Sequence, residues 1–263
     1  MLNVEHLLEE AKNNDLPINK KRAILREYLQ IIILNGIYKS KFAKSFLFMG
    51  GTALRYFYNL PRFSEDLDFN TADLTHDEFK RVIDITRAEL EREGFSVASD
   101  VQKRNNLFIA NIIFKDVVEK YAITDNRKAS LMVKVEINRP GWELMTESSV
   151  LSMYGYNFTA ILMSRANLLS EKICALFSRR LGRDIYDTLF MLRRKFPFNE
   201  NILKINHIKL PVKDAILEYL KEIGEKELKR LGAQLQPFLF KEEDIELVLK
   251  APLYAERFLE NHE

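Results

Sequence analysis

The sequence has little cysteine, no long apolar run and almost no excess of charge of either sign. Cys174 is its only cysteine, which excludes an internal disulfide framework and a multi-cysteine zinc site, and is typical of a reducing compartment. No window offers the roughly 18 unbroken apolar residues of a membrane span, and the N-terminus lacks a signal-peptide pattern. The net charge of +2 does not by itself indicate a nucleic-acid partner. We therefore expect a cytoplasmic protein without a membrane segment.

Size and patterning predict a mixed α/β half followed by a helical half. With 263 residues, 47% of them hydrophobic, the chain can bury a substantial core. Helical periodicity predicts helices at 18–40, which reads as amphipathic, 52–60 and 75–93, and only helices after residue 163. Strand patterns occur at 46–49, around Asp66 and Asp68, and at 95–101, 107–114, 130–138 and 157–163. We expect an α+β fold with an α/β domain over residues 1–163 and a helical domain over residues 164–263.

Two aspartates, Asp66 and Asp68, alternate with Leu67 and Phe69 in a short extended segment. Side chains of a strand alternate between faces, so both carboxylates point the same way while the apolar pair enters the core. Neighbouring carboxylates repel each other unless a cation compensates, and Mg²⁺ prefers carboxylate oxygens together with substrate phosphates. Ser64 lies on the same face. The geometry suits a magnesium ion, although an acidic surface turn is the simpler interpretation of the aspartate pair alone.

A glycine pair, Gly50 and Gly51, separates the strand at 46–49 from the helix that Thr52 begins. Glycines at such a junction let backbone N–H groups approach a polyphosphate, and the start of a helix favours anions. A tight turn without a ligand is the simpler reading of the pair alone. Its combination with the aspartate strand favours a polyphosphate site.

A third carboxylate, Glu136, lies on the strand at 130–138. It alternates with Val135 and Ile137, so it faces away from the core. It is placed to join the two aspartates, although many half-buried strands carry a glutamate on the solvent side.

Two segments, "GGTALRYFYNLPRFSEDLDF" and "EKICALFSRRLGRDIYDTLFML", carry a resemblance to a known family. They resemble the motifs of the AbiEii or MenT nucleotidyltransferase toxins, within the DNA polymerase β-like nucleotidyltransferase superfamily. The resemblance implies the fold of that superfamily, a mixed sheet flanked by helices, with a C-terminal helical domain. It also implies a toxin of a type IV toxin–antitoxin or phage-defence pair, with a cognate antitoxin as a possible partner.

The resemblance also implies roles for residues in both segments. Asp66 and Asp68 would bind Mg²⁺, and Gly50, Gly51 and Thr52 would contact the NTP substrate. Further contacts to the nucleotide would come from Arg62, Arg180, Arg55 and Asp184. Lys172 would neutralise phosphate charge and Asp187 would complete the site. Two more roles follow from the strand pattern and not from the resemblance: Ser64 could reach a phosphate, and Glu136 could help to deprotonate the acceptor. From the residues alone, Lys172 and Asp187 could equally be outer-face residues of two consecutive helices on either side of Gly182.

Basic residues are concentrated near the second segment. They are Arg179, Arg180 and Arg183, followed by Arg193, Arg194 and Lys195. Such clusters can follow a nucleic-acid backbone, or they can be the solvated ends of helices. With the resemblance, they favour an RNA acceptor such as the tRNA 3′ end.

We expect a Mg²⁺-dependent nucleotidyltransferase that transfers NMP from an NTP to an RNA hydroxyl. One alternative is a related transferase that acts on a small molecule or a protein. The other is a non-catalytic, antitoxin-like binding module that keeps the fold.

Overall fold

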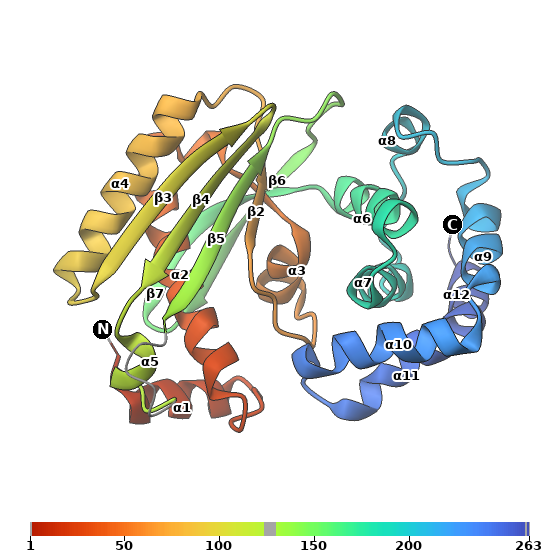
Figure 1. The fold of residues 1–263 in the computed structure, drawn as a ribbon. Helices are drawn as coiled ribbons and strands as arrows, with labels where there is room; N and C mark the ends of the chain where they lie inside the picture. The colour runs from red at the N-terminus through yellow and green to blue at the C-terminus, as the bar shows by residue number, and fades with distance from the viewer. Residues whose placement is uncertain (1, 124–129, 261, 263) are drawn as a thin grey trace. The chain divides into compact units, whose positions relative to one another are not determined.

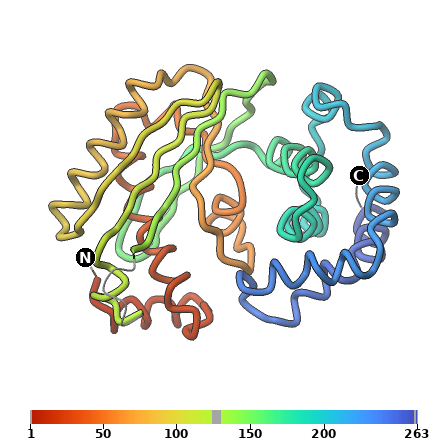
Figure 2. The backbone as a smooth tube through the Cα atoms, in the orientation of Figure 1, coloured from red at the N-terminus to blue at the C-terminus, as the bar shows by residue number. Residues whose placement is uncertain are grey.

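The structure, a computed structural model, describes residues 2–123, 130–260 and 262. The chain divides into two compact units. The α/β unit comprises the chain up to Asn59 together with Phe63–Leu162, and the helical unit comprises Leu60–Arg62 and the chain from Met163 onward. Figure 2 shows the first unit in red to green and the second mainly in blue-green to blue.

The α/β unit is built on one mixed sheet (Figure 1). The seven strands lie in the order β3-β4-β5-β2-β1-β7-β6. Their bounds are β1 (Leu47–Met49), β2 (Leu67–Asn70), β3 (Val97–Arg104), β4 (Leu107–Phe114), β5 (Leu131–Asn138), β6 (Thr146–Met153) and β7 (Tyr156–Met163). The helices of this unit are α1 (Val4–Asn13), α2 (Lys21–Lys39), η1 (Ala43–Ser45), α3 (Gly50–Tyr58), α4 (His76–Arg92) and α5 (Val117–Lys120).

The short strands β1 and β2 lie in the middle of the sheet, between β5 on one side and β7 on the other. β1 pairs antiparallel with β2 and parallel with β7, and β2 pairs parallel with β5. Three buried rings pack at this centre: Phe69 lies 5.4 Å from Phe46 and 5.1 Å from Phe48 between ring centroids. The aromatic core therefore fixes the strand that carries the aspartates.

Helix α2 differs from the amphipathic helix that the sequence predicts. Every residue from Glu27 to Tyr38 is buried, because α1, α4 and β5 all pack against this helix. Two of its buried polar side chains have partners inside the unit: Glu27 pairs with Arg55 at 3.0 Å, and the Tyr56 hydroxyl donates to Gln30 at 2.7 Å. Glu27 and Gln30, which the predicted amphipathic helix would place on its outer face, are instead buried and hydrogen-bonded.

Helix α4 begins as its sequence predicts. Thr75 is the N-cap, and it forms a complete capping box with Glu78.

Alternate residues of β4 and β5 are buried, and α4 packs against β3 and β4 while α2 packs against β5. One face of this part of the sheet is thus covered, and the alternate side chains occupy the other face.

The helical unit consists of short helices packed around α7. Their bounds are α6 (Arg165–Arg179), α7 (Gly182–Arg193), α8 (Glu200–Ile205), α9 (Val212–Glu222), α10 (Glu225–Leu235), η2 (Gln236–Phe238), η3 (Glu242–Ile245), α11 (Glu246–Leu249) and α12 (Ala251–Glu260). Gly182 allows α10 to approach the start of α7, because a Cβ there would lie 2.1 Å from the Leu231 carbonyl oxygen. Across the described parts of the chain, no helix combines the length and apolarity of a membrane span.

Candidate functional site

The acidic residues of the α/β unit lie on adjoining strands. In the parallel pairing of β2 with β5, Asp68 is the partner of Glu136 and Leu67 is the partner of Val135. Leu67, Phe69 and Val135 are fully or almost fully buried, whereas Asp66, Asp68 and Glu136 are half-buried. The expected alternation is confirmed, and Asp66, Asp68 and Glu136 share the less buried side of the sheet.

The glycine turn lies directly beside Asp68. Met49, the last residue of β1, is the strand partner of Asp68, and Gly50 then begins α3 with a φ of +76°. A Cβ on Gly50 would lie 2.5 Å from the Asp68 Oδ2 atom. Only glycine therefore fits between the strand and the helix here, for both conformational and steric reasons.

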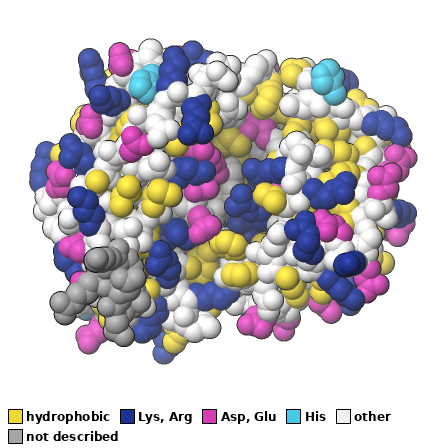
Figure 3. Space-filling model, in the orientation of Figure 1, with side chains coloured by type: hydrophobic (Ala, Val, Ile, Leu, Met, Phe, Trp, Pro, Cys, Tyr) yellow, Lys and Arg dark blue, Asp and Glu magenta, His cyan; other side chains and the backbone are white. Residues whose placement is uncertain are grey.

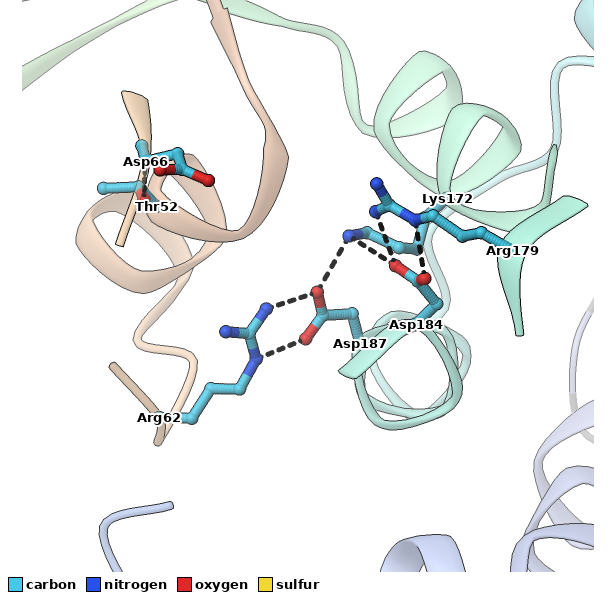
Figure 4. A network of polar contacts seen from close by, with 7 residues as sticks. All are labelled: Thr52, Arg62, Asp66, Lys172, Arg179, Asp184 and Asp187. Atoms are coloured by element: carbon cyan, nitrogen blue, oxygen red, sulfur yellow. Dashed lines mark hydrogen bonds and ion pairs between the residues drawn. The ribbon is translucent and has the colours of Figure 1, made fainter. Parts of the chain in front are cut away.

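Thr52 connects the start of α3 to the aspartate strand. Its hydroxyl donates to the Asp66 carbonyl oxygen at 2.5 Å (Figure 4). Helix α3 begins two residues earlier than expected, at Gly50, so Thr52 lies inside its first turn and does not cap it. Gly51 is buried in the same turn. The first turn of α3 is thereby fixed against the residue that the sequence nominates for metal binding.

The segment before Asp66 is held by α2. Gln30 Nε2 donates to the carbonyl oxygens of Ser64 at 3.1 Å and Glu65 at 2.9 Å, and Arg26 forms an ion pair with the Glu65 carboxylate. The sequence nominated Ser64 for a nucleotide contact; in the structure its backbone is fixed by Gln30. The Gln30 contact was not foreseen, because it joins positions 34 residues apart.

Lys134 is a cation among these carboxylates that the sequence reasoning missed. Its Nζ atom lies 3.5 Å from Asp66 Oδ2 and 3.2 Å from Glu136 Oε2. Burial would lower the pKa of Lys134, but the attraction of Asp66 and Glu136 outweighs it and raises the pKa above its ordinary value. The available signal was the position of Lys134 two residues before Glu136, on the same face of β5.

Several nominated residues of the helical unit form an ionic network around two buried aspartates (Figure 4). Arg62 makes two hydrogen bonds to the Asp187 carboxylate, at 2.7 and 2.6 Å. Lys172 Nζ lies 3.0 Å from Asp187 Oδ2 and 3.3 Å from Asp184 Oδ1. Arg179 completes the network with hydrogen bonds to Asp184 at 2.8 and 2.9 Å. Lys172 on α6 and Asp187 on α7 therefore do converge across Gly182, as the spacing suggested.

Charge sets the protonation of both aspartates in this network. Burial alone would raise their pKa values, but Arg62 and Lys172 lower that of Asp187, and Lys172 and Arg179 lower that of Asp184. The side chains of both aspartates are fully buried. The five side chains Arg62, Lys172, Arg179, Asp184 and Asp187 carry three positive and two negative charges, a net charge of +1.

Two other nominated arginines have partners within their own units. Arg55 is buried against Glu27. Arg180 is exposed, and its guanidinium donates to the Tyr219 hydroxyl at 3.1 Å and lies 5.2 Å from the centroid of that ring. These contacts describe the protein without ligand, and the nucleotide contacts expected of Arg55, Arg62 and Arg180 remain predictions.

Replacing Gly50 with alanine should destabilise the α/β unit more than the same change at Gly155. Both glycines have a similar positive φ, +76° and +79°, so both variants carry a backbone strain of about 1 kcal/mol. A Cβ on Gly155 meets no atom within 4 Å, whereas one on Gly50 meets Asp68. We expect urea denaturation to show that Gly50→Ala loses about 1–3 kcal/mol more free energy of unfolding than Gly155→Ala does. Equal losses in the two variants would mean that the turn and Asp68 are not in contact.

Comparison of the whole chain with known structures identifies its fold. The structure of JHP933 from Helicobacter pylori is similar, with a TM-score of 0.59, 18% identity and coverage of 91% of this chain and 92% of that one. A putative nucleotidyltransferase from H. pylori matches equally, with a TM-score of 0.59, 18% identity and coverage of 91% and 95%. MenT4, a nucleotidyltransferase toxin from Mycobacterium tuberculosis, has a TM-score of 0.60, 16% identity and coverage of 98% and 94%. The expected fold, a mixed sheet flanked by helices as in these nucleotidyltransferases, is confirmed.

Comparison at the sequence level identifies the family. No curated protein sequence matches this chain. The sequence profile described as "Nucleotidyl transferase AbiEii toxin, Type IV TA system" matches residues 32–259. This range covers most of the chain, including the glycine turn, the aspartate strand and both helices of the ionic network. The chain belongs to the AbiEii nucleotidyltransferase toxin family of type IV toxin–antitoxin systems, and it is a nucleotidyltransferase.

Proposed function

We propose that this nucleotidyltransferase uses Mg²⁺ to transfer NMP from an NTP to a hydroxyl of RNA, at a site such as the tRNA 3′ end. One observation carries the proposal: Asp68 lies against the Gly50 turn, on the same side of the sheet as Asp66 and Glu136. This arrangement places hard oxygen ligands beside backbone N–H groups at the start of a helix. Such a combination suits a metal-bound triphosphate.

The donor set fits magnesium, provided that the substrate completes the coordination. Within residues 2–123, 130–260 and 262, no three His, Cys, Asp or Glu side chains are arranged to hold one metal ion. Mg²⁺ in phosphoryl-transfer sites, however, is commonly bound through one or two carboxylates together with substrate phosphates. We assign Asp66 and Asp68 as those ligands. The bound ion would neutralise charge on the phosphates.

The residues of the chain have separate roles in the proposed transfer. The acceptor oxygen forms a bond to the α-phosphorus, the bond from that phosphorus to the pyrophosphate oxygen breaks, and Glu136 takes the acceptor proton. Gly50, Gly51 and the backbone N–H of Thr52 orient the triphosphate. Lys172 neutralises phosphate charge while Asp187 orients its ammonium group. Most of the rate acceleration would come from alignment and electrostatic stabilisation.

The basic end of α7 supports RNA as the acceptor. Arg193, Arg194 and Lys195 are all exposed there, and consecutive exposed cations of this kind can contact a phosphate backbone. Arg179 and Arg180 contact Asp184 and Tyr219 instead. On the face that Figure 3 shows, Lys and Arg are interspersed with Asp and Glu, so RNA contacts would be local. In this proposal the protein acts in the cytoplasm, and a cognate antitoxin restrains it.

The acceptor can be identified directly. We expect purified protein incubated with each α-labelled NTP, Mg²⁺ and total RNA to leave label on RNA of a discrete size, and chelation of the metal to abolish the labelling. Label on protein alone, or only on a small product, would contradict an RNA acceptor and favour the related transferases that act on proteins or small molecules. Treatment of the product with RNase distinguishes these outcomes.

A further inference from the structure

Lys134 occupies the position between two carboxylates of the candidate site. Its ammonium lies 3.5 Å from Asp66 Oδ2 and 3.2 Å from Glu136 Oε2. The contact to Asp66 joins β5 to the residue that precedes β2, and the contact to Glu136 stays within β5. All three side chains are partly exposed, at 30%, 31% and 26% respectively.

The repulsion between these carboxylates explains why a cation is needed. Asp66, Asp68 and Glu136 bring three negative charges to one side of two adjoining strands. Like charges that share a partly desolvated site destabilise each other unless a positive charge compensates. Lys134 provides such a charge within the chain itself. Because a lysine stem is long and flexible, its ammonium can leave without any change in the strands.

We propose that Lys134 is a built-in counter-ion, which holds the acidic site together before the metal binds and competes with the metal for Asp66. The proposal rests on the proposed function, because it takes Asp66 as a ligand of a divalent cation. A metal ion on the Asp66 oxygen that faces Lys134 would be repelled by the ammonium beside it. Lys134 therefore opposes metal binding at that oxygen, and metal binding there weakens the contact between Lys134 and Asp66.

The inference gives Lys134 a role in metal affinity, whereas a direct contact to phosphate would give it a role in nucleotide affinity. A lysine that binds phosphate would weaken NTP binding when it is removed and leave metal binding in the absence of nucleotide unchanged. A counter-ion has the opposite signature, because its removal strengthens metal binding.

The test measures metal binding by the full chain without nucleotide. Mn²⁺ replaces Mg²⁺ because its free and bound forms can be distinguished by electron paramagnetic resonance. The variant Lys134→Met removes the charge and keeps much of the stem, Lys134→Arg keeps the charge, and Lys115→Met removes an exposed lysine just beyond β4. We expect Lys134→Met to bind Mn²⁺ about tenfold more tightly than the wild type, and the other two variants to bind it almost as the wild type does.

A second readout follows the stability of the same proteins. Without metal, Lys134→Met should unfold at a lower temperature than the wild type, because Asp66 and Glu136 lose their shared cation. Addition of Mn²⁺ should raise its unfolding temperature more than that of the wild type. The inference would be overturned if Lys134→Met bound Mn²⁺ only as tightly as the wild type or more weakly, or if neither protein bound Mn²⁺ measurably. It would also be overturned if the variant lost affinity for NTP alone.

NMP transfer by the wild type, measured on the same preparation, separates this inference from the proposed function. Transfer together with equal Mn²⁺ affinities would overturn only the role of Lys134. Tighter Mn²⁺ binding by Lys134→Met without any transfer to an acceptor would overturn only the proposed function.

Discussion

Replacement of both Asp66 and Asp68 with alanine is expected to lower NMP transfer by at least about a thousandfold. The double variant removes the carboxylate oxygens that we assign to the metal, and with them the charge that positions it against the triphosphate. Labelled NMP transfer by the purified protein measures the loss, and expression of the variant in cells should no longer arrest growth.

The matched control for this variant is Asp73→Ala. Asp73 follows β2 closely in the sequence, and its side chain is exposed, so its removal should leave transfer and growth arrest unchanged. Circular dichroism should show that the double variant is folded, since Leu67 and Phe69 still anchor the strand. A folded double variant that still arrests growth and transfers NMP would remove these aspartates from the chemistry.

The second large effect concerns the stability of the helical unit. Replacement of Asp187 with alanine removes the bidentate partner of Arg62 and one carboxylate partner of Lys172, both of which are buried. Removing one member of a buried ionic network typically costs about 3–5 kcal/mol, because the remaining charges are left undercompensated. Denaturant unfolding of the full chain should show a loss of this size. The exposed Asp214 provides a control, whose change to alanine should cost about 1 kcal/mol or less.

The free energy of unfolding should differ between the wild type and Asp187→Ala in a pH-dependent way, and this dependence identifies the electrostatic origin of the difference. Burial would raise the pKa of Asp187, but Arg62 and Lys172 lower it below the ordinary value of 3.8. The ionised carboxylate therefore stabilises the fold at every pH above its unfolded pKa, and this contribution is lost as the pH falls through the folded pKa. The difference in free energy of unfolding between the wild type and Asp187→Ala should be constant from about pH 5 to 8 and shrink below about pH 4. A difference that does not change with pH would point to packing instead.

Local signals predicted the elements around the aspartates. The helix predicted at 75–93 starts with a capping box at Thr75, and the helix predicted at 52–60 ends near Asn59, which adopts a left-handed conformation with a φ of 56°. These features, like the alternation in β5, each depend on neighbours in the sequence. Strand β6 was not predicted, because its sequence shows no apolar alternation. It lies at the edge of the sheet, and only Leu151 of its eight residues is buried.

Long-range partners could not be predicted from the sequence. The pattern shows that Arg62 precedes the aspartate strand, but its bidentate partner Asp187 lies 125 positions away. Buried charges of this kind are recognisable only when the fold brings them together. Lys134 was not nominated, because nothing in the sequence of β5 reveals that Asp66 approaches it. The sequence therefore nominated residues for the candidate site, but it could not predict what each of them contacts.

The most direct test is the position of Mn²⁺ in crystals of the protein grown with a non-hydrolysable NTP analogue. Anomalous scattering from manganese locates the ion without reference to any assumed chemistry. We predict a peak about 2 Å from carboxylate oxygens of Asp66 and Asp68, with the triphosphate against the backbone of Gly50 and Gly51. A triphosphate bound elsewhere, or a metal ion that neither aspartate touches, would contradict this account of the site.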